Sequence, residues 1–217
     1  MHASYMQVGD VMDRSKTVLL VMGSTRAGRN CPRITQWVAQ IGRDCTGLAY
    51  EVVDLAEWPL PMDDEPAVPA IGPYVQAHTR AWSDKVKGAD AVIFITPQFN
   101  WGYPAVLKNA IDHLYAEWRD KPAAIVTYGG HGGTRCARQL RQVAVSVKMR
   151  VVVTAPAIKL SEEVIRQGAA FDPDRDFQLH RASVRRALGE LSALVARREH
   201  FLARARRRWR AFRSAVL

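Results

Sequence analysis

The sequence has few cysteines and no long hydrophobic run. Its three cysteines, Cys31, Cys45 and Cys136, match no metal-binding spacing and form no even set for disulfides. Reduced thiols in a cytoplasmic protein are therefore expected, and no metal site. No apolar run reaches the roughly 18 residues of a membrane-spanning helix, and the first sixteen residues contain no apolar segment of signal-peptide length. Neither export nor a membrane span is expected.

Three common motifs are also absent. The dinucleotide-binding pattern G-x-G-x-x-G does not occur, and the P-loop pattern fails at its lysine. Ser24, Asp54 and His78 or His131 could supply the side chains of a hydrolase triad, but the G-x-S-x-G elbow is missing. Acyl transfer is therefore not expected. Asp54 ends the second strand, where an acid binds ribose in dinucleotide-binding folds, but without the glycine pattern it is expected to cap a loop or a helix.

The order of apolar segments predicts an α/β fold. The run from Ala91 to Ile95 is apolar throughout, as in a strand buried on both faces of a parallel sheet. Amphipathic helical segments alternate with such runs, including one over 74–88 and one that begins at Pro104. With 217 residues and short connections, the chain predicts one doubly wound, five-stranded parallel sheet. The expected strands are residues 17–22, 48–55, 91–95, 122–128 and 151–153.

The loop after the first strand, GSTRAGRN at residues 23–30, has the composition of an anion-binding loop. It leads into a helix, whose free N–H groups and positive dipole end attract a phosphate. The hydroxyls of Ser24 and Thr25 can donate hydrogen bonds, and Arg26 and Arg29 add charge-assisted ones. Arg26 is nearer to the strand end than Arg29, so Arg26→Ala is expected to weaken binding more than Arg29→Ala. A monophosphate fits this loop better than a pyrophosphate. Taken alone, the loop could also be polar with two solvated arginines.

Two further loops follow the third and fourth strands. Residues 96–103, TPQFNWGY, are rich in aromatic and amide side chains, which suits a planar, partly polar ligand. A stiff turn whose aromatics cover the core is an equally good interpretation of this loop alone. Four glycines surround His131 in residues 129–133, which allows the backbone to approach a flat ligand closely.

Three blocks together resemble the NADPH-dependent FMN reductase family of flavodoxin-like enzymes, which act on flavins, quinones and azo dyes. The blocks are GSTRAGR, PQFNWGYPAVLKNAIDHL and KPAAIVTYGGHGG, and the resemblance covers about residues 16–160. It implies a flavodoxin-like fold with FMN at the carboxyl end of the sheet, and a homodimer or dimer of dimers. Residues that match the family would hold the flavin phosphate through Ser24, Thr25, Arg26 and Arg29, and the ring through Pro97, Gln98, Phe99, Asn100, Trp101, Tyr128, Gly129, Gly130 and His131. The family often has Glu-Tyr in place of Gln98-Phe99.

The resemblance also implies an NAD(P)H oxidoreductase that passes two electrons through FMN to a quinone, flavin or azo-type acceptor by a ping-pong mechanism. No catalytic side chain is named, because the flavin carries the hydride chemistry. The choice between NADPH and NADH stays open. Two alternatives are a flavodoxin-type electron carrier and a redox-responsive binding protein built on the same core. The aromatic residues near the flavin loop, Trp101, Tyr103, Tyr115 and Trp118, are expected at a subunit interface. The alternative, that they cover the core of one protomer, applies best to Tyr115.

The end of the chain is strongly basic. The whole chain carries 31 Lys and Arg against 21 Asp and Glu, a net charge of +10. A helix is expected from Leu179 to the end, packed on the sheet through about Val195. We divide the chain into a flexible arm (1–15), a flavodoxin-like domain (16–196) and a basic amphipathic helix (197–217). The last is expected to clasp a neighbouring subunit; contact with a membrane or nonspecific nucleic-acid binding is less favoured. Its arginines are Arg197, Arg198, Arg204, Arg206, Arg207, Arg208, Arg210 and Arg213.

Overall fold

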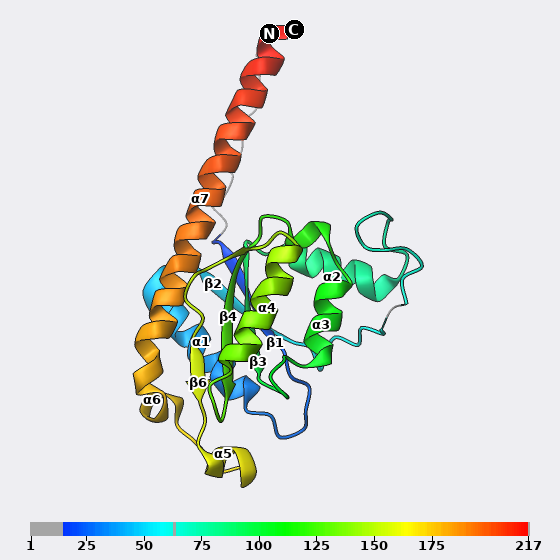
Figure 1. Ribbon diagram of the computed structural model, residues 1–217. Helices are drawn as coiled ribbons and strands as arrows, with labels where there is room; N and C mark the ends of the chain where they lie inside the picture. Colours follow the sequence, from blue (N-terminus) through cyan, green and yellow to red (C-terminus); the bar gives the residue numbers. More distant parts are fainter. Residues whose placement is uncertain (1–14, 63, 217) are drawn as a thin grey trace, which may run out of the picture.

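The computed structural model describes residues 15–62 and 64–216, with side chains through residue 200. The predicted arm at 1–15 therefore lies almost wholly outside the described residues. A parallel sheet forms the centre of the molecule, with the strand order β2-β1-β3-β4-β5 and with β6 also paired to β4 (Figure 1). The strands are β1 (Thr17–Met22), β2 (Ala49–Asp54), β3 (Ala91–Pro97), β4 (Pro122–Gly129), β5 (Arg150–Val151) and β6 (Ala157–Lys159). The predicted flavodoxin-like doubly wound fold is confirmed.

The fifth strand position is divided into two short segments. Arg150 pairs with Pro122 at the start of β4, whereas Ala157 pairs with Thr127 near its end. Between them the chain leaves the sheet, and the main-chain N–H of Thr127 donates to the carbonyl of Pro156 at 2.9 Å. The sequence predicted a single strand at 151–153 and missed β6, because three residues that follow a proline give no strand pattern.

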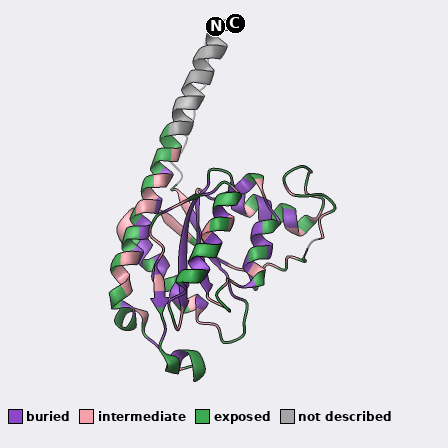
Figure 2. Cartoon of the chain, in the orientation of Figure 1, coloured by how far each residue is buried: buried purple, intermediate pink, exposed green. Residues whose placement is uncertain are grey.

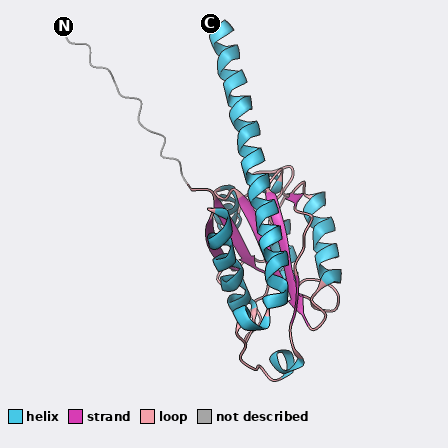
Figure 3. Ribbon diagram, turned by 90° about the vertical axis from the view of Figure 1, so that its left-hand side faces the viewer, coloured by secondary structure: helices cyan, strands magenta, loops and turns pink. Residues whose placement is uncertain are grey.

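Helices cover both faces of the sheet (Figures 1 and 3). On one face, α1 (Cys31–Thr46) and α7 (Gln178–Val216) enclose an apolar core with the strands. On the other, α2 (Ala77–Lys87), α3 (Ala105–Asp112) and α4 (Thr134–Ser146) enclose a second core. Three short helices complete the chain: η1 (Ala116–Trp118), α5 (Glu162–Arg166) and α6 (Pro173–Asp176). The seven residues of β3 lie between the two cores and are all buried, as predicted.

Two helices begin later than the sequence predicted. Helix α2 begins at Ala77 and not at Tyr74, because the Glu65 carboxylate accepts the N–H groups of Val75 at 2.9 Å and Gln76 at 3.0 Å. Pro104 precedes α3 as its N-cap, with ψ 146°, and is not its first helical residue.

The last helix is the longest element, as expected. Its first half packs on the sheet through Val184, Leu188, Leu191 and Val195, all buried (Figure 2). The helix then continues past the sheet to Val216 (Figure 1). No helix among the described residues combines the length and the apolar character needed to cross a membrane.

Candidate active site

The loops after β1, β3 and β4 meet in one cleft beyond the carboxyl ends of these strands. The cleft has a volume of about 290 Å³. In an open parallel sheet, ligands bind at this end of the strands. Nine residues expected at a flavin site line it: Ser24, Arg26, Arg29, Pro97, Gln98, Phe99, Tyr128, Gly129 and Gly130. The structure therefore brings together three segments that are far apart in the sequence.

The first loop places one buried hydroxyl and one half-buried guanidinium at the cleft. Ser24 is 2% exposed, and Arg29 forms an ion pair with Asp54, the last residue of β2. The Nε of Arg29 is buried and has no hydrogen-bond partner within the described chain. Asp54 also accepts the N–H of Ala56 at 3.0 Å, so it caps its own loop as predicted. Arg29, which lines the cleft, thus keeps one buried donor without a partner in the described chain.

The second arginine of this loop is bound to the aromatic loop. Arg26 is exposed, and its guanidinium lies 4.3 Å from the centre of the Phe99 ring. A cation over an aromatic face is attracted by the ring quadrupole. The contact connects the loops after β1 and β3 across the cleft. Thr25 is exposed and does not line the cleft.

The aromatic loop contains a tight hairpin turn. Phe99 and Gly102 exchange two main-chain hydrogen bonds of 2.8 Å. Asn100 and Trp101 between them have φ of 46° and 71°, the left-handed values that a type I′ turn requires at both central residues. Asn tolerates this region well, whereas Trp rarely adopts it. The turn projects Trp101, which is 60% exposed and covered on one face by Arg135, 3.3 Å from its ring centre. Neither Asn100 nor Trp101 lines the cleft.

Gln98 connects this loop to the fourth strand and the helix that follows it. Its main-chain N–H donates to the carbonyl of Tyr128 at 3.0 Å. Its side-chain oxygen accepts the N–H of Cys136, in the first turn of α4, at 3.2 Å. A glutamate could make the same bond, which explains how either residue type serves at this position.

The loop after β4 forms the opposite side of the cleft. Tyr128 is 4% exposed, and burial raises the pKa of its phenol well above the usual range. Neither Gly130 nor His131 donates its main-chain N–H to a carbonyl of the described chain. His131 is exposed and lines an adjoining hollow of about 1130 Å³. At Gly133, with φ 91°, an added Cβ would lie 2.8 Å from Cβ of Thr127, so packing alone requires this glycine.

Sequence reasoning missed one wall of the cleft. It is formed by Leu160, Val164, Ile165 and Gly168, around α5. The N–H of Leu160 donates to the carbonyl of Gly129 at 3.0 Å, which anchors this segment to the end of β4. The sequence indicates α5 only weakly, because the helix has five residues. The pattern that could have identified it is the N-cap residue Ser161 followed by two glutamates.

Trp118 corrects an interface prediction. It is 0% exposed, packs edge-on against Trp82 and Phe94, and donates its Nε1 hydrogen to the carbonyl of Ile111 at 2.9 Å. The side chain belongs to the core of one protomer, because η1 turns it inward.

Comparisons with known proteins identify the family that the chain resembles. The sequence pattern of the family described as NADPH-dependent FMN reductase matches residues 16–163. An NAD(P)H-dependent FMN reductase of Schizosaccharomyces pombe is 51% identical over 179 residues, which are 82% of this chain and 89% of the relative. One of Saccharomyces cerevisiae is 42% identical over 165 residues, 68% of this chain and 86% of the relative. Among solved structures, the flavoenzyme NAD(P)H:(acceptor) oxidoreductase FerB of Paracoccus denitrificans has a similar fold, with a TM-score of 0.63 and 22% identity over 82% of this chain and 98% of that one.

Proposed function

The chain belongs to the NADPH-dependent FMN reductase family, and we propose that its cleft binds FMN and alternately admits NAD(P)H and a small electron acceptor. Membership makes it an FMN-dependent NAD(P)H oxidoreductase. The proposal adds which residues hold the cofactor and how the two substrates share the site. The observation that carries it is the meeting of the three loops in one cleft.

The first loop fits a phosphate monoester. The Nε–H of Arg29 is a buried donor without a partner, and such atoms are rare in proteins unless a ligand completes them. Beside it are the hydroxyl of Ser24 and the charge of Arg26. Because Asp54 balances one of the two positive charges, the site matches a single phosphate better than a more highly charged one.

The remaining walls fit a flat, partly polar ring system. Pro97, Phe99 and Ile165 supply apolar surface, and Gly130 provides main-chain atoms without a side chain. The N–H groups of Gly130 and His131 would donate to the polar edge of the ring, where preorganised dipoles stabilise negative charge that develops on reduction. When bound, FMN supplies the hydride chemistry, accepting two electrons from the nicotinamide and delivering them to the acceptor.

The side chains that line the cleft offer no general base. Among the described residues that line it there is no carboxylate and no imidazole, and burial keeps Tyr128 protonated over the working pH range. The residues of the cleft therefore serve to bind and orient the flavin and its substrates. Because donor and acceptor would use the same open side of one cleft, they must bind in turn, which gives ping-pong kinetics. A quinone, a free flavin or an azo compound is flat enough to take that place.

We also propose that the enzyme is a homodimer or a dimer of dimers. In support, Trp101 is held out beside the cleft and is 60% exposed, and large exposed aromatics are typical of interface cores.

Reconstitution and steady-state kinetics test the function. The purified protein should take up one FMN per chain and oxidise NADPH or NADH continuously with a soluble quinone, giving parallel double-reciprocal lines. An electron carrier would stop after its bound flavin is reduced. A protein that ignores added FMN contradicts the site, and intersecting lines contradict the shared cleft.

A further inference from the structure

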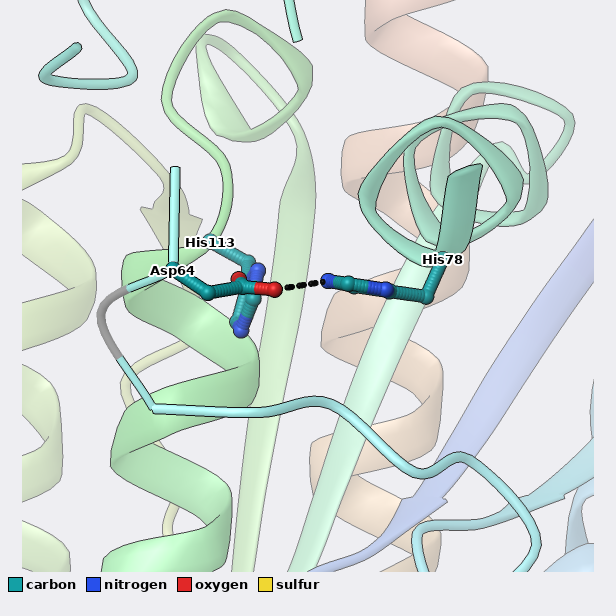
Figure 4. A group of neighbouring side chains, drawn as sticks. All are labelled: Asp64, His78 and His113. Atoms are coloured by element: carbon teal, nitrogen blue, oxygen red, sulfur yellow. Dashed lines mark ion pairs between the residues drawn. The ribbon is translucent and has the colours of Figure 1, made fainter. Parts of the chain in front are cut away.

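Three metal-ligating side chains converge outside the cleft (Figure 4). Asp64 comes from the loop between β2 and α2, His78 from the first turn of α2, and His113 from the C-cap of α3. One ligand atom from each lies within 4.8 Å of the other two. Because the three residues come from separate segments, no sequence motif indicates them.

Two of these side chains have a buried polar atom without a partner. Oδ1 of Asp64 and Nε2 of His78 are buried and have no hydrogen bond within the described chain. Nε2 of His78 lies 2.8 Å from Oδ2 of Asp64 (Figure 4), but the two atoms do not form a hydrogen bond. Buried polar atoms are nearly always satisfied, so the cluster is incomplete as it stands.

The hydrogen bonds of His113 leave one of its nitrogens with a lone pair. Its Nε2 lies 2.7 Å from the carbonyl oxygen of Pro61, and a carbonyl only accepts, so Nε2 carries the hydrogen. Nδ1 therefore has the lone pair, which now accepts the Thr79 hydroxyl at 3.0 Å. A metal-bound imidazole is commonly held in this way, with its other nitrogen donating to a backbone carbonyl. The Thr79 hydroxyl has an alternative acceptor in Glu65.

An acidic hollow opens beside the cluster. It has a volume of about 240 Å³ and is lined by Asp64, Glu65, Asp112 and His113 together with apolar and amide residues. No cationic side chain lines it among the described residues. The hollow reaches two of the three side chains, Asp64 and His113, and leaves room for a water molecule.

We propose that Asp64, His78 and His113 form a site for a divalent transition metal, with zinc as the best-matched ion. Two imidazoles and one carboxylate are a ligand set that zinc uses with a water in the fourth position, whereas magnesium and calcium prefer oxygen ligands alone. Zinc bonds of about 2.0–2.2 Å place tetrahedral ligand atoms about 3.4 Å apart. The spacing here, 2.8 Å for one pair and within 4.8 Å for all three, brackets that value.

A bound ion would fasten the loop between β2 and α2 to two helices. Without a metal, the same residues would amount to an ion pair and an edge-on contact of the two histidine rings, 5.8 Å between centres. The two interpretations differ in whether added metal binds here and stabilises the fold.

Zinc titration of the full-length, FMN-loaded protein after chelator treatment decides between them. We expect one tightly bound zinc per chain by competition with a chromophoric chelator, and a midpoint of thermal unfolding that rises with zinc. Asp64→Asn and His78→Gln alter half-exposed side chains, and each should weaken zinc binding by at least about tenfold. His200→Gln, which changes an exposed histidine on α7, far from both sites in the sequence, should bind zinc like the wild type.

The flavin spectrum reports that each variant is folded, independently of metal. X-ray absorption of the zinc-loaded protein should show nitrogen and oxygen ligands with two imidazoles. Absence of zinc binding at stoichiometric protein, or equal binding by the Asp64→Asn/His78→Gln double variant, would overturn the site. Sulfur in the absorption spectrum would also overturn it, since the metal would then sit on a cysteine.

Discussion

Arg29 and Asp54 form an ion pair that joins the ends of two neighbouring strands. Arg29 lies in the loop after β1, and Asp54 ends β2, where it is the register partner of Met22. The pair is mostly buried, with 20% and 14% of the two side chains exposed. Asp54 therefore fixes the direction of the guanidinium and would face a bound phosphate if Arg29 were removed.

Arg29→Ala should weaken FMN binding more than Arg26→Ala. It removes a charge-assisted hydrogen bond, worth about 1.5–3 kcal/mol or about 10- to 150-fold in affinity, and it exposes the phosphate to the Asp54 carboxylate. Arg26→Ala should cost less than about tenfold, since Arg26 is exposed and is held by Phe99. Quenching of flavin fluorescence measures both constants.

The double variant Arg29→Ala/Asp54→Asn is the matched control. If the Asp54 carboxylate repels the phosphate, the double variant should regain part of the FMN affinity that Arg29→Ala loses. The sequence favoured Arg26, because it is nearer the strand end, so an equal or larger loss with Arg26→Ala would support the sequence argument against the structural one.

Lys121 should make stability rise with pH. It is 2% exposed and donates to the carbonyls of Val86 at 2.8 Å and Ala89 at 2.6 Å, and burial, aided by Arg198, lowers its pKa to about 8. The unfolded value is about 10.4, so between these two values the unfolded chain binds the proton more tightly. The free energy of unfolding should therefore gain up to about 3 kcal/mol from this group as the pH rises through that window.

Urea unfolding of the wild type and Lys121→Met at pH 7.5 and pH 10 isolates the effect. Buried tyrosines titrate in both proteins and cancel in the comparison. Lys121→Met leaves two carbonyls unpaired and is less stable at either pH, so the diagnostic quantity is the difference between the two pH responses. Identical responses would show that Lys121 stays charged in the fold.

Trp118→Ala should lower the stability of the fold, whereas Trp101→Ala should change the oligomeric state. Truncation of the fully buried Trp118 should lower the free energy of unfolding by about 3–5 kcal/mol. Trp101→Ala should change it by no more than about 1 kcal/mol, the size of an exposed cation–π contact, while it shifts the oligomer toward monomer. Light scattering and urea unfolding measure the two effects. A Trp101→Ala protein that keeps the wild-type mass removes Trp101 from the interface.

Deletion of residues 200–217 tests the subunit clasp. The far end of α7 projects past the sheet at the end opposite α5, which walls the cleft (Figure 1). The truncated protein should therefore be a smaller oligomer with an unchanged flavin spectrum. An unchanged mass, together with loss of salt-sensitive binding to anionic vesicles or DNA, would assign the helix to docking instead.

The sequence predicted the fold better than it predicted the site. Apolar runs such as Ala91–Ile95 identify strands because burial on both faces leaves little choice of residue. Loop composition indicated Ser24 and Arg29, yet it could not show that Arg29 pairs with Asp54 or that Asn100 and Trp101 do not line the cleft. Such facts depend on which segments the sheet brings together. The same holds for His78 and His113, which are 35 positions apart in the chain and are adjacent only after folding.

The division of the outer strand position into β5 and β6 has a consequence for association. An edge strand with a continuous row of unpaired main-chain N–H and C=O groups can pair with a strand of another molecule. Over residues 150–159 that row is broken by the excursion through Pro156, which has no N–H to offer, and the segments on either side have two and three residues. Growth of the sheet from molecule to molecule is therefore interrupted on this side, and β2 is left as the edge with the longer row of main-chain groups.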